Sequence, residues 1–153
     1  MVSAMRRTGR WAHAPRMTAA ANIATVQTIY QAFGTGDVAT ILGVVADDVD
    51  RASEADSTVA PWHGVHKGRD EVPHFFQAIG EALDVTRFEP LAFTANDDGD
   101  VMTVIRFGMR SKETGRSGEM DLHHWFRFGP DGKVARYRGT EDTAMTASIL
   151  AGD

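Results

Sequence analysis

The chain has 153 residues, a formal net charge of −5 and no cysteine. A chain of this length is expected to form one domain, and the absence of cysteine excludes disulfides, thiol nucleophiles and thiolate metal sites. No apolar run reaches the roughly 18 residues that a membrane-spanning helix needs, and no secretory pattern occurs. We therefore expect a cytoplasmic protein without a membrane partner.

The positive charge is concentrated at the start of the chain. Residues 1–16 contain four arginines and no acidic residue, and removing these charges from the total of −5 leaves −9 for residues 17–153. An acidic body repels phosphate backbones, so we expect no nucleic-acid partner. Residues 1–17 are predicted to be a basic, disordered leader, or to precede a translation start at Met17; an acidic partner surface is an alternative role for them. Residues 18–153 are predicted to form the domain.

Apolar residues at helical spacing predict three helices in the first half of the chain. The first covers Ala19–Phe33 and ends at the Gly-Thr-Gly that follows, because glycine suits a left-handed cap. Asp37 is predicted to cap the second helix and Asp70 the third, with a short strand around Val49–Ser53 between them. The polar segment Glu54–Lys67 is predicted to be a long loop that forms a lid or rim.

In the second half the pattern changes to an alternation of period two, which is typical of strands. A short helix after a cap at Asp142 closes the chain. Helices followed by an antiparallel meander predict an α+β domain, with the helices covering one face of a curved sheet. The predicted strands are Arg87–Ala95, Val101–Arg110, 119–128 and 134–141.

One polar residue interrupts an apolar row in the strand 119–128. Its even positions are apolar except for His124, and side chains alternate across a strand, so His124 is expected to face the interior. On the returning strand Tyr137 and Glu141 have the same parity and are expected on the same wall. The alternatives are a core histidine with both nitrogens satisfied, a tyrosine that fills the core, and a glutamate at an exposed strand end.

Seven short motifs occur in a characteristic order between residues 22 and 151, and in this order they resemble the SnoaL-like family of the nuclear transport factor 2-like, or ketosteroid-isomerase-like, superfamily. The resemblance implies three N-terminal helices and a curved antiparallel sheet that enclose a cone-shaped cavity. It also implies a homodimer packed through the sheet. The motifs are Gly34-Thr35-Gly36-Asp37, Ala46-Asp47-Asp48-Val49, Pro61-Trp62-His63-Gly64-Val65-His66-Lys67-Gly68-Arg69, Phe75-Phe76, Thr114-Gly115-Arg116, His124-Trp125-Phe126 and Asp131-Gly132-Lys133-Val134.

The residues that carry known mechanisms in this superfamily are replaced here. Steroid isomerases use a carboxylate base, an oxyanion-binding carboxylic acid and a tyrosine on a helix, whose places are taken by Ser53, His124 and Ile29. The epoxide-hydrolase branch uses one arginine and two aspartates. The matching positions are near Ile105, Phe107 and Gly139.

The resemblance also implies a reaction class, because SnoaL-like cyclases act on small polyketides without a cofactor. We hypothesise that His124 transfers a proton, that Glu141 orients His124 and raises its basicity, and that Tyr137 donates to a developing enolate oxygen. The expected ligand is a small hydrophobic, carbonyl-bearing molecule, and the expected reaction is a cyclisation, isomerisation or hydration. The alternative is a non-catalytic ligand-binding or dimerisation module of the same fold, which Ser53 in the base position favours.

Three further residues are candidates for ligand binding. Trp62 can stack on a flat ligand or close the mouth of the cavity. Arg51 has the parity of Val49 and Ser53, so it either binds an anionic group in the cavity or pairs with Glu54 or Asp56 at the rim. Phe126 belongs to the row of His124.

Two other groups of residues are assigned no catalytic role. His63, His66 and His74 are too scattered to form a metal site, so no metal is expected. The outward residues of the strand 119–128 and its neighbour fit a dimer interface better than a site. They are Arg106, Asp121, His123 and Trp125.

Overall fold

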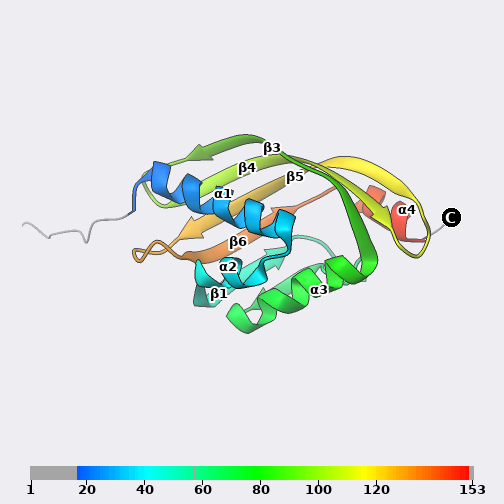
Figure 1. Ribbon diagram of the computed structural model, residues 1–153, viewed down its shortest axis with the longest axis horizontal. Helices are drawn as coiled ribbons and strands as arrows, with labels where there is room; N and C mark the ends of the chain where they lie inside the picture. The colour runs from blue at the N-terminus through cyan, green and yellow to red at the C-terminus, as the bar shows by residue number, and fades with distance from the viewer. Residues whose placement is uncertain (1–16, 57, 152–153) are drawn as a thin grey trace, which may run out of the picture.

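The computed structural model describes residues 17–56 and 58–151, which form a curved sheet of six strands with helices on its concave side (Figure 1). The predicted α+β class is therefore confirmed. Nearly all of the predicted leader lies outside the described residues. None of the described helices is long and apolar enough to cross a membrane.

The helices begin and end largely where the sequence predicts. Helix α1 covers Ala19–Thr35 and ends at Gly36, whose φ of 71° is the left-handed conformation that glycine adopts without strain. Helix α2 covers Val38–Gly43 and is capped by Asp37, as predicted. Helix α4 covers Thr143–Ala151, and Asp142 accepts a bond from the Met145 amide at its start.

The start of the third helix differs from the prediction. Helix α3 covers Val72–Ala82 and follows a 3₁₀ turn, η1, over Arg69–Glu71. Glu71 takes the N-cap position without a side-chain bond, so Asp70 is not the cap that was predicted. The proline in the first turn fixes the helical φ without losing a hydrogen bond, which explains why the helix begins there without a side-chain cap.

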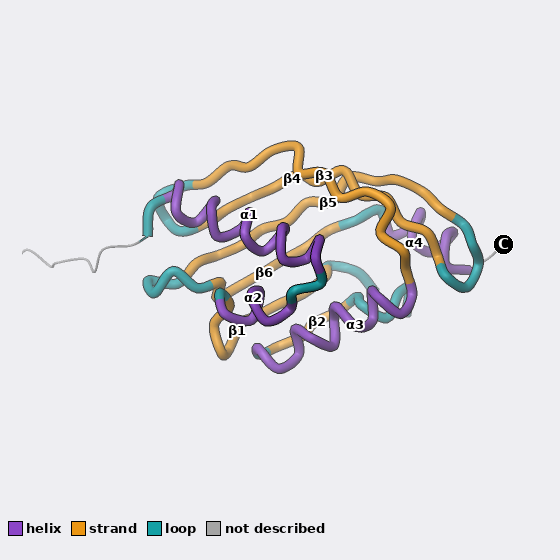
Figure 2. Tube along the Cα trace, in the orientation of Figure 1, coloured by secondary structure: helices purple, strands orange, loops and turns teal. Residues whose placement is uncertain are grey.

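The sheet joins both halves of the chain in the order β2-β1-β6-β5-β4-β3 (Figure 2). Strands β1 and β6 run parallel, and all other neighbouring strands run antiparallel. Strand β1, from the first half of the chain, therefore extends the antiparallel meander of β3 to β6 by pairing with β6. Strand β2 is a correction, because it lies inside the segment predicted to be a loop. The strands are β1 Val45–Ser53, β2 Gly64–Lys67, β3 Leu83–Ala95, β4 Asp100–Ser111, β5 Ser117–Phe128 and β6 Val134–Thr140.

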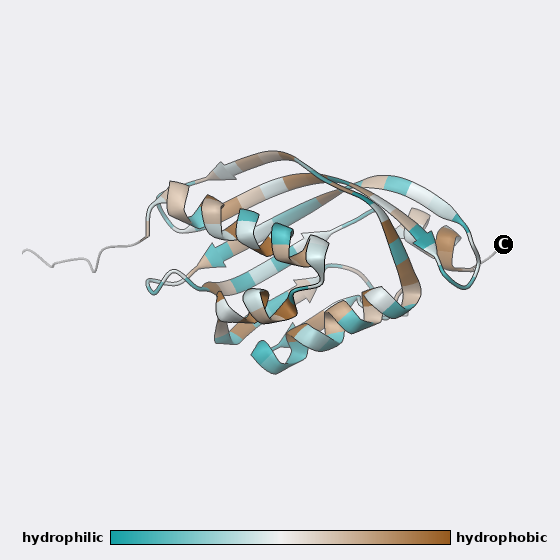
Figure 3. Ribbon diagram, viewed as in Figure 1, coloured by the Kyte–Doolittle hydropathy of each residue, from teal (hydrophilic) through white to brown (hydrophobic). Residues whose placement is uncertain are grey.

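The strand register places the candidate residues side by side on the concave face. Hydrophobic and hydrophilic residues alternate along the strands (Figure 3), so one face is apolar and meets the helices. Two rows cross the sheet at the centre of this face. One is Thr103, His124, Gly139 and Ser53, and the other is Val101, Phe126, Tyr137 and Arg51.

Candidate functional site

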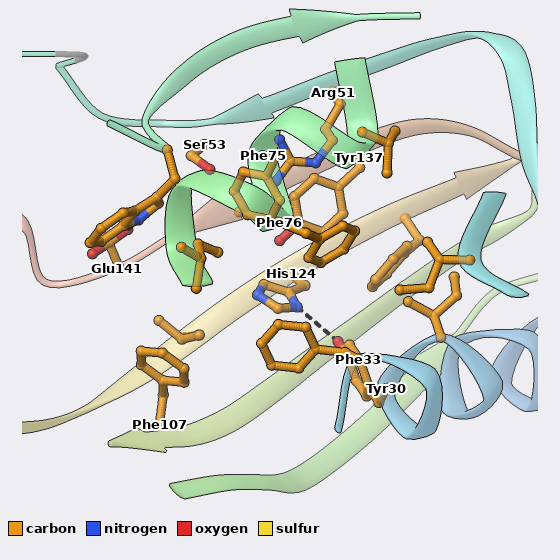
Figure 4. A pocket seen from close by; sticks show the side chains of 18 of the residues that line it. Tyr30, Phe33, Arg51, Ser53, Phe75, Phe76, Phe107, His124, Tyr137 and Glu141 are labelled. Atoms are coloured by element: carbon orange, nitrogen blue, oxygen red, sulfur yellow. Dashed lines mark hydrogen bonds between the residues drawn. The ribbon is translucent and has the colours of Figure 1, made fainter. Parts of the chain in front are cut away.

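A cavity of about 140 Å³ lies between the concave face and the helices α1, α2 and α3 (Figure 4). A cavity of about this size holds a single benzene ring in another protein. Its walls are mainly apolar and aromatic, and a few polar groups point into it. The polar lining residues are Tyr30, Arg51, Ser53, His124, Tyr137, Thr140 and Glu141.

His124 faces this cavity, as its parity in β5 predicted, and it is held from helix α1. Its Nδ1 lies 2.8 Å from the hydroxyl of Tyr30, and that hydroxyl lies 2.6 Å from Oγ1 of Thr103 (Figure 4 shows the first bond). Tyr30 was not predicted as a site residue. Its position four residues after Val26 in the buried stripe of α1 was the signal that it points at the sheet.

The imidazole of His124 is neutral at physiological pH. Burial, and then the nearby positive charge of Arg51, lower its pKa from 6.5 to about 3. The sequence hypothesis expected a pKa near or above the ordinary value, and the structure gives the opposite direction. A neutral imidazole can accept or donate one proton at the ring nitrogen that Tyr30 does not bind.

Tyr137 lies against His124, with ring centroids 5.2 Å apart, and its hydroxyl points toward the imidazole (Figure 4). This position depends on Gly139, since a Cβ there would lie 2.6 Å from the Tyr137 hydroxyl oxygen. Burial raises the pKa of Tyr137 to about 12, so the phenol keeps its proton and can donate a hydrogen bond. The register pairs Gly139 with both His124 and Ser53, so the phenol lies over the centre of that row.

Glu141 lines the cavity but does not orient His124, so that part of the hypothesis is corrected. Its carboxylate accepts bonds from Nε2 of His63 at 2.6 Å, from Nε1 of Trp62 at 3.2 Å and from the hydroxyl of Thr146. Strand β6 ends at Thr140, so the next residue no longer follows the alternation of the strand. Its carboxylate therefore pairs with the 60–63 turn instead of the sheet.

His63 is a second residue whose place in the site was not predicted, and 3% of its surface is exposed. It lies in a segment of polar composition, where a histidine gives no signal of burial. The neighbouring tryptophan was a hint, because Trp62 is also buried and belongs to a second apolar cluster with Phe107 and Met109. The predicted candidates Trp62 and Phe126 both line the cavity as core residues.

Arg51 points into the cavity, with 6% of its surface exposed. The acidic residues considered as alternatives have other partners: Glu54 pairs with Arg138, and Asp56 accepts bonds from Thr58. The guanidinium carbon lies 3.2 Å from the centre of the Phe75 ring. Burial lowers the pKa of Arg51 to about 10, so its charge is retained at neutral pH.

Within residues 17–56 and 58–151 no group of three or more His, Asp or Glu side chains is arranged to hold a metal ion. The polar groups of the cavity are instead suited to moving a proton. A neutral imidazole lies beside a protonated phenol in an apolar space, which is an acceptor and a donor within reach of one small molecule.

Comparison with known proteins places the chain in a family. A family model described as the SnoaL-like domain matches residues 26–137, while no curated protein sequence matches the chain.

Three solved structures illustrate the likeness of the fold. An NTF2-like protein from Burkholderia xenovorans LB400 is 26% identical, with a TM-score of 0.78 over 88% of this chain and 98% of that one. A protein provisionally named a polyketide cyclase from Xanthomonas campestris pv. campestris is 19% identical, with a TM-score of 0.71 over 86% of this chain and 98% of that one. TerC, co-crystallised with polyporic acid, is 20% identical, with a TM-score of 0.76 over the same shares. Because the family model covers more than half of its length, the chain belongs to the SnoaL-like family.

Proposed function

We propose that the protein binds a small apolar, carbonyl-bearing molecule of the polyketide type in this cavity and acts on it by acid–base chemistry without a cofactor. The reaction would be an isomerisation, a cyclisation or a hydration. The names of solved relatives, a provisional polyketide cyclase and a protein crystallised with polyporic acid, are consistent with this ligand class.

One observation carries the proposal: His124 and Tyr137 meet beside Gly139 in the wall of a mainly apolar cavity. The glycine leaves the space that the phenol occupies, and the register aligns it with the imidazole. Buried polar groups are costly unless they are paired. Within the described residues the Tyr137 hydroxyl has no hydrogen-bond partner, so it is free to bind a ligand oxygen.

The hydrogen bonds of the Tyr30 hydroxyl favour one tautomer of His124 and so decide which ring nitrogen is free to accept a proton from the ligand. Its hydroxyl carries one proton, and when that proton is donated to Thr103 the oxygen accepts the N–H of His124 Nδ1. The second ring nitrogen, Nε2, is then an acceptor. It takes a proton from the carbon beside the ligand carbonyl, while Tyr137 donates a hydrogen bond to the oxygen that becomes the enolate.

The enolate then reacts in one of two ways. Return of the proton from Nε2 to a different carbon gives an isomer of the ligand. Attack of the enolate carbon on a second carbonyl closes a ring, and the proton passes to the alkoxide so formed. Both routes restore neutral His124, and neither needs an oxidant or a reductant.

The alternative function, a binding module without catalysis, is favoured by a separate observation. An imidazole whose pKa lies near 3 is a weak base at neutral pH, and the isomerase base position holds Ser53. Such a cavity binds its ligand without transforming it. Ligand binding is therefore common to both functions, and proton transfer distinguishes them.

We further propose that the protein is a homodimer packed through the outer face of the sheet. This face presents Met102, 52% exposed, beside Trp125, whose indole binds Asp100 and contacts two arginines. Arg106 pairs with Asp121 across the same face. Sedimentation equilibrium of wild type and Met102→Asp measures the oligomeric state. A wild-type dimer that the substitution dissociates supports an interface on this face, and a wild-type monomer refutes the proposal.

The catalytic proposal is tested by hydrogen exchange at carbon. Acetophenone and 1-indanone are incubated with the protein in D₂O, and loss of the α-proton signal is followed by NMR. We expect wild type to accelerate exchange above buffer, His124→Gln and Tyr137→Phe to lose the acceleration, and the outward neighbour variant His123→Gln to retain it. Saturable binding without exchange supports the binding module, and the absence of binding by any ketone refutes both functions.

A further inference from the structure

Arg51 is a buried cation that has no hydrogen-bond acceptor among the residues that the structure describes. Its Nη1 and Nη2 atoms are fully covered, and neither donates a hydrogen bond within the described residues. No carboxylate of the described residues forms an ion pair with it either. The charge nevertheless remains, because even a lowered arginine pKa lies above neutral pH.

The surroundings of Arg51 hold the guanidinium in place but leave its donors unused. The guanidinium carbon lies 3.2 Å from the centre of the Phe75 ring, on which it stacks, and 5.2 Å from the centre of the Tyr137 ring. Figure 4 shows the guanidinium between the two rings. Ring faces attract a cation, but they accept none of the in-plane N–H bonds of the guanidinium. A buried charge normally has a partner of opposite charge, since an unpaired one is strongly unfavourable.

The direction of the side chain indicates where such a partner would lie. Arg51 occupies an inward position of β1 between Val49 and Ser53, and all three residues line the cavity. In the sheet it pairs with Tyr137, and its charge is close enough to lower the pKa of His124. An acceptor between Arg51 and Ser53 would therefore also lie beside the proposed proton-transfer residues.

We propose that the natural ligand is an organic acid whose carboxylate binds Arg51, with its apolar body against the aromatic walls of the cavity. The inference rests on the proposed small-molecule binding function and narrows it to anionic ligands. Since Nη1 and Nη2 are covered in this structure, the side chains around them must shift to admit the carboxylate, which a planar guanidinium then binds through two parallel N–H bonds. This geometry fixes the orientation of the ligand as well as its charge. The remainder of the ligand then extends toward His124.

The test uses two probes that differ in charge and little in shape, benzoate and benzamide. Each has one aromatic ring, the size that a cavity of about 140 Å³ accommodates. Dissociation constants are measured by NMR titration at neutral pH for wild type, Arg51→Met, Arg51→Lys and Arg136→Met. The last variant is the matched control, because Arg136 is exposed and has the same formal charge.

We expect wild type and Arg136→Met to bind benzoate about ten- to hundredfold more tightly than benzamide, which is the range for hydrogen bonds to a charged group. Arg51→Met is expected to lose this preference while keeping its affinity for benzamide, which shows that the cavity is intact. Arg51→Lys keeps the charge but loses the planar fork, so an intermediate preference is expected.

A second readout comes from His124. A bound carboxylate offsets the charge of Arg51, which is one cause of the low pKa of His124, so benzoate should raise that pKa. The ring signals of His124 are followed against pH with and without benzoate, and Arg51→Met is expected to abolish the effect of benzoate.

The outcomes separate this inference from the proposed function. If acetophenone binds or exchanges but benzoate binds no better than benzamide, the anion inference is overturned and the binding function stands. If the preference for benzoate persists in Arg51→Met, Arg51 is only a stacking partner of Phe75 and the inference is overturned. If none of these probes binds wild type, both proposals fail.

Discussion

Acid should destabilise this protein through His124, well above the pH at which carboxylates titrate. In the unfolded chain a histidine has a pKa of about 6.5, whereas burial lowers the pKa of His124 to about 3 in the folded protein. Below pH 6.5 the unfolded chain therefore binds a proton that the folded chain does not bind. The stability that depends on neutral His124 is fully present above pH 6.5 and is lost as the pH falls toward 3.

The size of the effect follows from the separation of the two pKa values. Each pKa unit corresponds to about 1.4 kcal/mol, so a shift of about 3.5 units removes about 5 kcal/mol at most. At pH 5 the unfolded histidine is protonated and the folded one is not, and the loss is about 2 kcal/mol relative to pH 8. A domain of this size has only about 5–15 kcal/mol of stability, so this loss is readily measured.

The assay is urea unfolding between pH 5 and pH 8, followed by tryptophan fluorescence, for wild type, His124→Gln and His123→Gln. Only the change with pH is compared, because His124→Gln also disturbs the bond to Tyr30 and lowers stability at every pH. We expect the wild-type loss of about 2 kcal/mol to persist in His123→Gln and to be nearly absent in His124→Gln. Identical pH profiles for wild type and His124→Gln would refute the reasoning, since His124 would then titrate normally.

Three other substitutions test the contacts around the cavity. Gly139→Ala places a Cβ 2.6 Å from the Tyr137 hydroxyl oxygen, so we expect it to reduce ketone hydrogen exchange about as strongly as Tyr137→Phe does; unchanged exchange would contradict the role of the phenol. Glu141→Gln weakens the acceptor of the hydrogen bonds from His63, Trp62 and Thr146 and should cost about 1–3 kcal/mol in urea unfolding; a cost within experimental error would show that these bonds are not formed. Tyr30→Phe leaves two buried acceptors or donors unpaired and should cost about 1–3 kcal/mol, with wild-type stability as the result that contradicts the bond.

The fold could be predicted because its elements have clear local signals. The stripe of α1, the cap at Asp37 and the alternation of β4 and β5 are patterns that a few residues determine. Strand β2 has no such signal, since it is four residues long and lies at the sheet edge, where neither face is fully buried. It becomes a strand by pairing with β1, which is a long-range property.

The sequence predicts toward which face of the sheet the site residues point, but it does not predict their hydrogen-bond partners. Alternation alone places His124 on the concave face and indicates the same for Arg51. The partner of His124 is Tyr30, which lies 94 residues away on a helix, and the partner of Glu141 is 78 residues away in a turn. Such pairs depend on how α1 crosses the sheet and how the 60–63 turn folds back, and no local pattern determines either.

The same burial that gives the cavity its apolar character creates an electrostatic cost that a ligand can relieve. Arg51 is charged and has no acceptor in the described part of the chain, and His124 is kept neutral partly by that charge. An acid bound at Arg51 would therefore do two things at once: it would pair the cation and raise the basicity of the imidazole beside it. The weak base of the free protein would become a stronger base only when the ligand is in place. Binding and proton transfer are coupled in this arrangement, so a ligand without the negative charge should bind more weakly and also exchange its α-proton more slowly.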